Sequence, residues 1–147
     1  MVTSSKRATT PSDGLVDALA QAAFVTMAVL NKLGAENELS LTQLRVCGIL
    51  RDRRLNMAAL ATYLGLGKST MTGLVDRAEA RGLMARAPND DDGRGIDVFL
   101  TKEGLKLADS LERQFRDALA PLTGRLDVPS QRRLQELLER MLDDPEE

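Results

Sequence analysis

The chain has 147 residues, of which 43% are hydrophobic and 29% charged, a size and composition typical of one soluble globular domain. It contains no His, no Trp and a single Cys, which excludes a Cys₂His₂ or Cys₄ zinc site, a Ser-His-Asp triad and a Cys-His nucleophile pair. Carboxylate, Lys and Tyr side chains form no recognisable catalytic arrangement in their place. We therefore predict a protein that is not an enzyme and that needs neither a metal nor another cofactor.

A single cysteine cannot form an internal disulfide, which favours a reducing compartment and predicts a cytoplasmic protein. The most membrane-like stretch, from Leu15 to Leu30, is interrupted by Asp17 and Gln21. It is shorter than the ~20 apolar residues that a membrane span requires. We interpret it as an amphipathic helix and expect no membrane partner.

The formal net charge is −2, but the charges are unevenly distributed along the chain. Residues 45–88 hold eight Lys and Arg against three Asp and Glu, whereas residues 126–147 hold three against seven. A local excess of positive charge matters more for binding nucleic acid than the total does. The basic middle segment therefore keeps a nucleic-acid partner open.

The first half of the chain predicts a Ser- and Thr-rich disordered arm, residues 1–12, followed by two helices. The first helix begins near Leu15 and is expected to end at Gly34, a typical C′ residue. The second begins after Ser40, which forms a capping-box pattern with Gln43.

Two further helices follow in close succession. The third is capped by Asn56 and stopped by Gly65. The fourth starts after only Leu66 and Gly67, runs from about Lys68 to Arg81, and ends at Gly82. Two helices joined by a tight turn that contains glycine predict a helix-turn-helix.

After Gly82 the hydrophobic period changes from helical to alternating. Two short strands are predicted, residues 83–87 and 96–100, and in the second Ile96, Val98 and Leu100 alternate with Asp97 and Phe99. A turn-rich loop lies between them, which makes a long-looped β-hairpin. Thr101 then caps a long helix that Pro121 should kink or end. A last helix runs from about Pro129 to Leu142.

This order of elements predicts a mainly α fold with a small antiparallel β-hairpin: a winged helix-turn-helix lobe flanked by N- and C-terminal helices. Ala61 is expected where the two helices cross, and Gly65 at a turn that needs positive φ. The apolar contacts between the two helices are expected from five further residues: Leu60, Leu64, Leu66, Met71 and Leu74. Seven positions thus agree with one motif.

The stretch LGLGKSTMTGLVDRAEARGLMAR, the wing DDDGRG and the following DVFLTKEG resemble the MarR family of bacterial transcription regulators. The wing pattern, Asp92-x-Arg94 followed by Leu100-Thr101-x-x-Gly104, is the most specific part. The resemblance spans residues 15–142. It implies a homodimer with interlocking terminal helices, and many such proteins release DNA when a small phenolic or anionic ligand binds between the lobes.

The resemblance predicts a ligand-responsive repressor that binds a pseudo-palindromic operator. Residues at the start of the fourth helix are expected to face base edges and phosphates. Arg77 is expected to contact a phosphate or to form an internal ion pair. Arg94 is expected to enter a minor groove. Asp92 is interpreted as structural in the wing. The predicted DNA-binding residues are Lys68, Ser69, Thr70, Thr72, Arg77 and Arg94. Gly73 occupies a position where the family often has a polar side chain, and the absence of Trp argues against the urate-responsive members.

Four residues are candidates for a ligand cleft, although core packing explains them equally: Phe24, Met27, Cys47 and Phe115. Cys47 lies on the apolar side of its helix, where a buried structural thiol is favoured over a redox sensor.

We expect one regulator domain, residues 13–147, in which 40–101 form the DNA-binding lobe and 13–38 and 102–147 the dimerisation helices. The main alternative is a winged-helix protein-interaction module without DNA affinity, which Gly73 and the negative net charge favour. A small enzyme using Tyr63 and the acidic run 90–92 is a third possibility.

Overall fold

Nine helices and strands make up the part of the chain that the structure, a computed structural model, describes: residues 11–91 and 94–143. The helices are α1 (Pro11–Glu36), α2 (Leu41–Leu50), α3 (Met57–Leu64), α4 (Lys68–Ala80), α5 (Lys102–Thr123) and α6 (Val128–Leu142). The strands are β1 (Leu55–Asn56), β2 (Met84–Pro88) and β3 (Ile96–Leu100). The predicted fold class, mainly helical with a small antiparallel sheet, is confirmed.

Side-chain caps start α2, α3 and α5 at the positions that the sequence predicts. Ser40 accepts a hydrogen bond from the backbone N–H of Gln43, whose side chain accepts one in return from the N–H of Ser40. Asn56 caps α3 and Thr101 caps α5 through the N–H of Gly104. Each cap satisfies backbone donors that the first turn leaves without partners.

The sheet contains one strand more than the predicted hairpin. β3 is the central strand and pairs antiparallel with β2 on one side and with β1 on the other. In β1, Leu55 lies opposite Val98 and Asn56 opposite Asp97. A strand of two residues is too short to produce an alternating pattern, so hydrophobic periodicity does not predict it.

The end of α1 also differs from the prediction. The helix continues beyond Gly34 to Glu36, and the chain reverses at Glu38, which has φ of 56°. A Cβ atom on Gly34 would lie 2.6 Å from the carbonyl oxygen of Leu39. Gly34 is therefore needed for the close return of the chain, not for a helix cap. At the other end α1 begins at Pro11, and the remainder of the predicted arm, residues 1–10, lies outside the described residues.

Pro121 does not end α5, which continues to Thr123. The following turn is held by Gln131, whose side-chain amide donates to the carbonyl oxygens of Thr123 and Leu126 at 3.1 and 2.9 Å.

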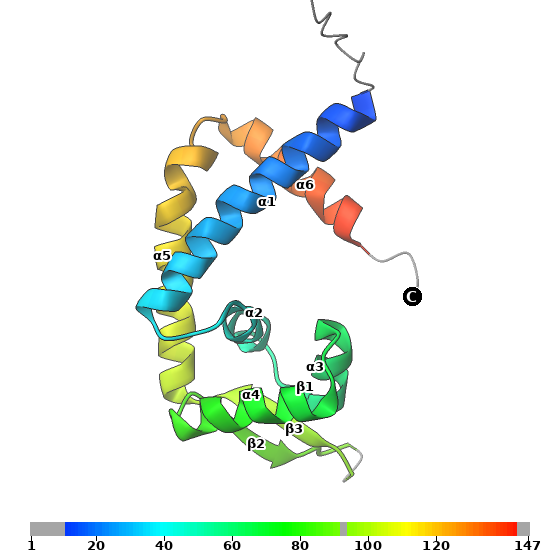
Figure 1. Ribbon diagram of the computed structural model, residues 1–147, viewed down its shortest axis with the longest axis vertical. Helices are drawn as coiled ribbons and strands as arrows, with labels where there is room; N and C mark the ends of the chain where they lie inside the picture. The colour runs from blue at the N-terminus through cyan, green and yellow to red at the C-terminus, as the bar shows by residue number, and fades with distance from the viewer. Residues whose placement is uncertain (1–10, 92–93, 144–147) are drawn as a thin grey trace, which may run out of the picture.

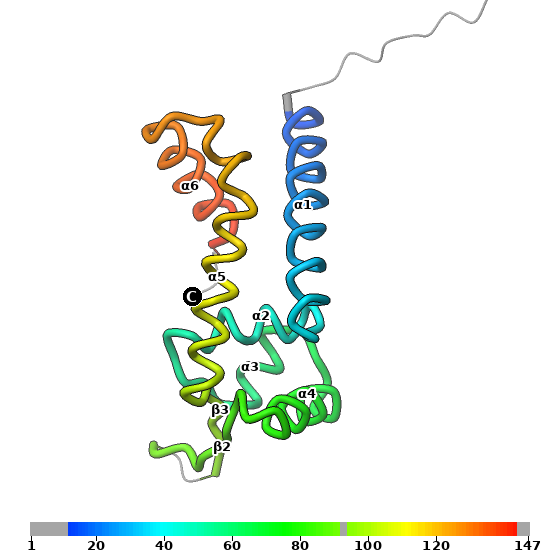
Figure 2. The backbone as a smooth tube through the Cα atoms, turned by 90° about the vertical axis from the view of Figure 1, so that its left-hand side faces the viewer, coloured from blue at the N-terminus to red at the C-terminus, as the bar shows by residue number. Residues whose placement is uncertain are grey.

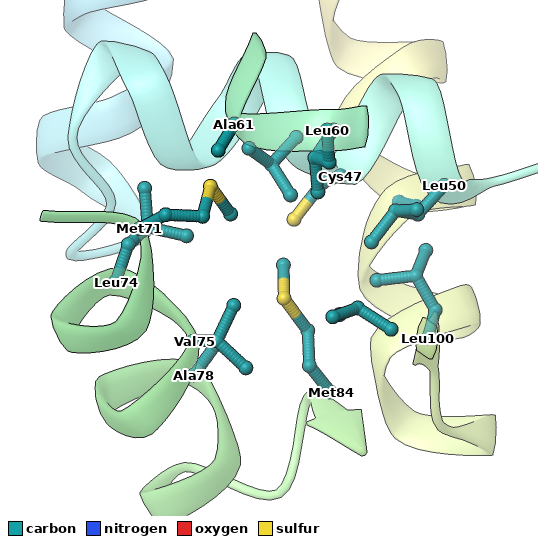
Figure 3. Packing of buried hydrophobic residues seen from close by; sticks show 13 residues of the cluster. Cys47, Leu50, Leu60, Ala61, Met71, Leu74, Val75, Ala78, Met84 and Leu100 are labelled. Atoms are coloured by element: carbon teal, nitrogen blue, oxygen red, sulfur yellow. The ribbon is translucent and has the colours of Figure 1, made fainter. Parts of the chain in front are cut away.

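The main core lies between α2, α3, α4, the sheet and the start of α5 (Figure 3). Its fully buried side chains are Val46, Leu50, Leu60, Met71, Val75 and Val98. Ala61 is buried as expected, and Gly65 ends α3 with φ of 66°. The predicted contacts of the helix-turn-helix are thus confirmed, since Leu64 and Leu66 also pack against this cluster.

The core unit and the long helices occupy opposite ends of the molecule. Figure 1 shows α3, α4 and the sheet together at one end, with α2 across them. In Figure 2, α1 and α5 both rise from this lobe, and α6 returns from the far end of α5. Helices α1 and α5 contact each other where they cross. Arg81, at the end of α4, donates to the carbonyl oxygens of Glu38 and Asn37 at 2.8 and 3.1 Å and so ties the lobe to the end of α1.

Helix α1 is longer than the expected amphipathic segment, and within the described residues it alone is long and apolar enough to cross a membrane by length and composition. Its first two-thirds expose several large apolar side chains in the single chain: Leu15, Val16, Phe24, Val25 and Met27. Its last turns are buried against the lobe, because Leu33 is part of the hydrophobic interior.

Candidate nucleic-acid interface

Helices α3 and α4 form the helix-turn-helix, and the start of α4 projects from it. The side chains of Lys68, Ser69 and Thr70 are exposed, whereas Thr72 is half-buried. Gly67 is the N-cap residue, and as a glycine it has no side chain that could cap the first turn of α4. This end of α4 therefore offers a positive side chain, hydroxyl groups and free backbone N–H groups, all suited to phosphates and base edges.

Arg77 is exposed on α4, one turn after Gly73. A Cβ atom on Gly73 would lie 3.3 Å from the Nη1 atom of Arg77. The missing side chain at Gly73 thus leaves room for the guanidinium to lie along the helix surface. The departure from the family pattern at Gly73 coincides with an exposed cation four residues later.

The wing is the loop between β2 and β3, and Arg94 lies exposed at its far side. Asp92, predicted to be structural in the wing, lies outside the described residues. Asn89 shapes the near side of the loop, because its N–H donates to the carbonyl of Gly95 and its side-chain oxygen accepts from the N–H of Asp91, both at 2.9 Å.

The base of the wing is fixed by Asp97, which is buried with 8% of its surface exposed. One carboxylate oxygen accepts a hydrogen bond from Nε of Arg54 and the other from the side-chain amide of Asn89, each at 2.9 Å. Arg54 also donates to the carbonyl oxygen of Pro88 at 3.2 Å and lies 5.1 Å from the ring centre of Phe99. The alternation of Asp97 with the apolar residues of β3 does not place it in solvent, because this ion pair lets the carboxylate be buried.

Of the four predicted cleft residues, three line one cavity of about 500 Å³ between α1, α2 and α5: Met27, Cys47 and Phe115. Phe24 does not line it, since its side chain lies further along α1 and is 74% exposed. Most of the remaining walls are apolar, and Arg45, Arg51, Asp52 and Glu112 supply the charges. Arg51 is already paired with Asp109 at 2.9 Å and with Glu112.

Cys47 is buried, and its sulfur atom points toward the side chains of the main core (Figure 3). Burial raises the pKa of this thiol to about 11, and the nearby charge of Arg81 opposes the shift only in part. The thiolate is therefore scarce at neutral pH. These properties fit the predicted structural thiol.

Two arginines that sequence reasoning did not select have defined positions here. Arg54 holds the wing base, and Arg86 on β2 forms ion pairs with Asp76 and Glu79 of α4. Arg54 stood out only as part of a basic cluster, and Arg86 only as a polar residue of an alternating strand. Partners more than ten residues away in sequence give no local signal, as with Arg54 and Asp97.

A sequence model of the MarR family matches residues 37–95, which include α2, the helix-turn-helix and β2. The homoprotocatechuate degradative operon repressor of Escherichia coli is 27% identical to this chain over 131 residues, 88% of each protein. These matches support a winged-helix regulator similar to the MarR family. The matched relatives are named as repressors or transcription regulators. These names favour a regulator over the small enzyme that the acidic loop and Tyr63 left as a third possibility.

Solved MarR-family structures share the fold. NadR in complex with 4-hydroxyphenylacetate matches with a TM-score of 0.73 and 24% identity, covering 96% of this chain and 97% of NadR. A mutant of MarR from Escherichia coli complexed with operator DNA matches with a TM-score of 0.65 and 21% identity, covering 92% and 100%. The winged helix-turn-helix architecture of this chain is thereby confirmed.

Proposed function

We propose that this chain is a homodimeric repressor that binds a pseudo-palindromic operator in double-stranded DNA. The proposal rests on the exposed start of α4, which lies beside a wing with an exposed Arg94. The similarity of the chain to a named operon repressor supports it. α4 would enter the major groove and the wing an adjacent minor groove. Such a protein works in the cytoplasm, where its operator lies.

We assign the roles on DNA residue by residue. Ser69, Thr70 and Thr72 face base edges, while Lys68 and Arg77 neutralise phosphates. Arg94 reads the width of the minor groove, which is narrowest in A·T-rich sequence. The lobe comprises residues 40–101, flanked by the dimerisation helices 13–38 and 102–147.

The dimer is proposed from the apolar surface that the single chain leaves exposed. Helix α6 contains no buried residue, yet Leu134, Leu137 and Met141 recur on it at helical spacing. Exposed apolar side chains on α1 leave further apolar area uncovered in the single chain. An obligate homodimer interface is large and apolar, and a two-fold axis would place two copies of α4 about one helical turn of DNA apart, ~34 Å. This assignment also explains the apolar character of α1 without a membrane.

We further propose that the cavity between α1, α2 and α5 binds a small phenolic or anionic effector. Its volume of about 500 Å³ lies in the range of small-molecule sites. Two relatives are associated by name with phenolic compounds: the homoprotocatechuate operon repressor and the 4-hydroxyphenylacetate complex of NadR. Arg45 is the cation better placed to meet an anion, because Arg51 is occupied by two carboxylates. Helices from the lobe and from the arms share the cavity wall, so a bound effector would change the spacing of the two lobes.

Fluorescence anisotropy with labelled duplex DNA tests the proposal. Duplexes are first selected from a random-sequence pool by the purified wild-type protein, and a shuffled duplex of the same composition is the control. We expect tighter binding to the selected duplex and a steep loss of affinity with rising salt, because bound Lys and Arg release counterions. Absence of binding to any duplex at low salt would overturn the proposal and favour a protein-interaction module.

A further inference from the structure

Helix α4 carries a carboxylate on the surface proposed to face DNA. Asp76 lies two helical turns after Ser69 and one turn after Thr72, so the three side chains share one face. The side chain of Asp76 is 57% exposed. Glu79 follows near the edge of the same face, half-buried. Carboxylates here would repel DNA phosphates and oppose the contribution of Lys68 and Arg77.

Arg86 reaches these carboxylates from the wing strand β2. Its guanidinium forms a close ion pair with Asp76, and its Nη1 lies 3.3 Å from a carboxylate oxygen of Glu79. The Nη2 atom is also 3.5 Å from the carbonyl oxygen of Thr72, at the limit of a hydrogen bond. One side chain thus connects the wing strand to three successive turns of α4.

The contact is not one that mainly stabilises the lobe. Arg86 is mostly buried, and within the described residues its Nε is a buried N–H group without a hydrogen-bond partner. A partly buried ion pair that leaves one donor unsatisfied adds little net stability. The ion pairs of Arg86 therefore matter more for the charge on α4 and for the position of α4 relative to β2 than for the stability of the lobe.

We propose that Arg86 is a positioning residue for DNA binding. It neutralises Asp76 and Glu79 and keeps their carboxylates turned toward β2, and it fixes α4 relative to the wing so that both elements meet the duplex in one orientation. The inference rests on the proposed DNA-binding function. Under this inference the wing strand β2 positions α4 for DNA binding, in addition to the DNA contact proposed for the wing loop.

A double-mutant cycle measures this coupling, using the selected and shuffled duplexes described above. Arg86→Met is expected to weaken binding to the selected duplex roughly tenfold, because two carboxylates on the DNA-facing side are released. Asp76→Asn alone should change affinity less than about twofold, since Arg86 already neutralises the carboxylate, whereas in the Arg86→Met background it should restore most of the loss. Arg125→Met, in the turn between α5 and α6, removes the same charge away from the residues assigned to DNA and is the matched control for net charge. Because it lies in the dimerisation part, it is compared with wild type at equal dimer content, measured by sedimentation, and should then bind equally well.

The outcomes separate the inference from the function on which it rests. If the wild type selects no duplex, the proposed function fails. If the wild type binds DNA and Arg86→Met binds as well as Arg125→Met, the positioning role is overturned. It is also overturned if Asp76→Asn alone abolishes selective binding, because Asp76 would then read a base. Should Arg86→Met fail to fold, the cycle is repeated with Arg86→Lys, which keeps the charge but cannot hold both carboxylates, and the same rescue by Asp76→Asn is expected.

Discussion

Replacing Asp97 with Ala should destabilise the lobe more than any change of an exposed acidic residue. The carboxylate is buried and accepts hydrogen bonds from Arg54 and Asn89, each at 2.9 Å. Hydrogen bonds to a charged group contribute ~1.5–3 kcal/mol each. The contribution of the hydrogen bond from Arg54 must be set lower than this range, because 39% of the Arg54 side chain is exposed to solvent. We expect a loss of about 2–3 kcal/mol in the free energy of unfolding.

Urea denaturation at fixed protein concentration measures this change, and a thermal scan should show a midpoint lower by roughly 5–10 °C. Asp109→Ala is the matched control, because Asp109 also pairs with an arginine at 2.9 Å but is 57% exposed. Its loss should not exceed about 1 kcal/mol. If the two variants were equally stable, the wing base would not depend on a buried ion pair and the reasoning would be refuted.

Further changes test the wing, α4, the start of α5 and the core. Arg94→Ala should weaken binding to selected and shuffled duplexes alike and lower the salt slope by about one unit, and an unchanged slope would mean that the wing tip does not touch DNA. Thr72→Ala should cost about 1–3 kcal/mol on the selected duplex and much less on the shuffled one in the same anisotropy assay, and equal losses on both would remove its role as a base reader. Gly104→Ala should lower the stability in urea by about 1–3 kcal/mol, because the added Cβ would overlap the carbonyl oxygen of Leu83, and full stability would contradict this steric argument. The raised pKa of Cys47 predicts that the protonated thiol stabilises the fold below pH 9 and that this contribution is lost as pH rises toward 11. Cys47→Ala should therefore show a smaller decline of unfolding free energy over that interval than wild type, and an identical decline would contradict the burial argument.

Local chemistry made the starts of α2, α3 and α5 and the helix-turn-helix predictable from the sequence. Ser40 with Gln43, Asn56 and Thr101 act within four residues of their own positions. Gly65 adopts the positive φ that a tight turn needs. Signals of this kind depend on neighbours along the chain, which a single sequence contains in full.

Features that depend on distant partners were not predictable. The pairing of Leu55 with Val98 joins segments more than forty residues apart, and so does the ion pair between Arg54 and Asp97. Phe24 was a candidate for the cleft, but the cavity is lined on α1 by Met27, Leu30 and Leu33, and a sequence pattern does not tell how far along the helix a cavity extends. The roles of individual residues on DNA remain predictions, because the structure contains the protein chain alone.

A hydroxyl-radical footprint of the selected duplex tests the central claim most directly, since it reports both the dimer and the two DNA-contacting elements. A homodimer that places α4 in the major groove and the wing in the minor groove predicts two protected half-sites related by two-fold symmetry, about one helical turn apart. Arg94→Ala should remove the protection at the outer minor-groove positions and leave the central pattern in place. A single asymmetric patch, or no protection at concentrations that saturate anisotropy, would contradict this account.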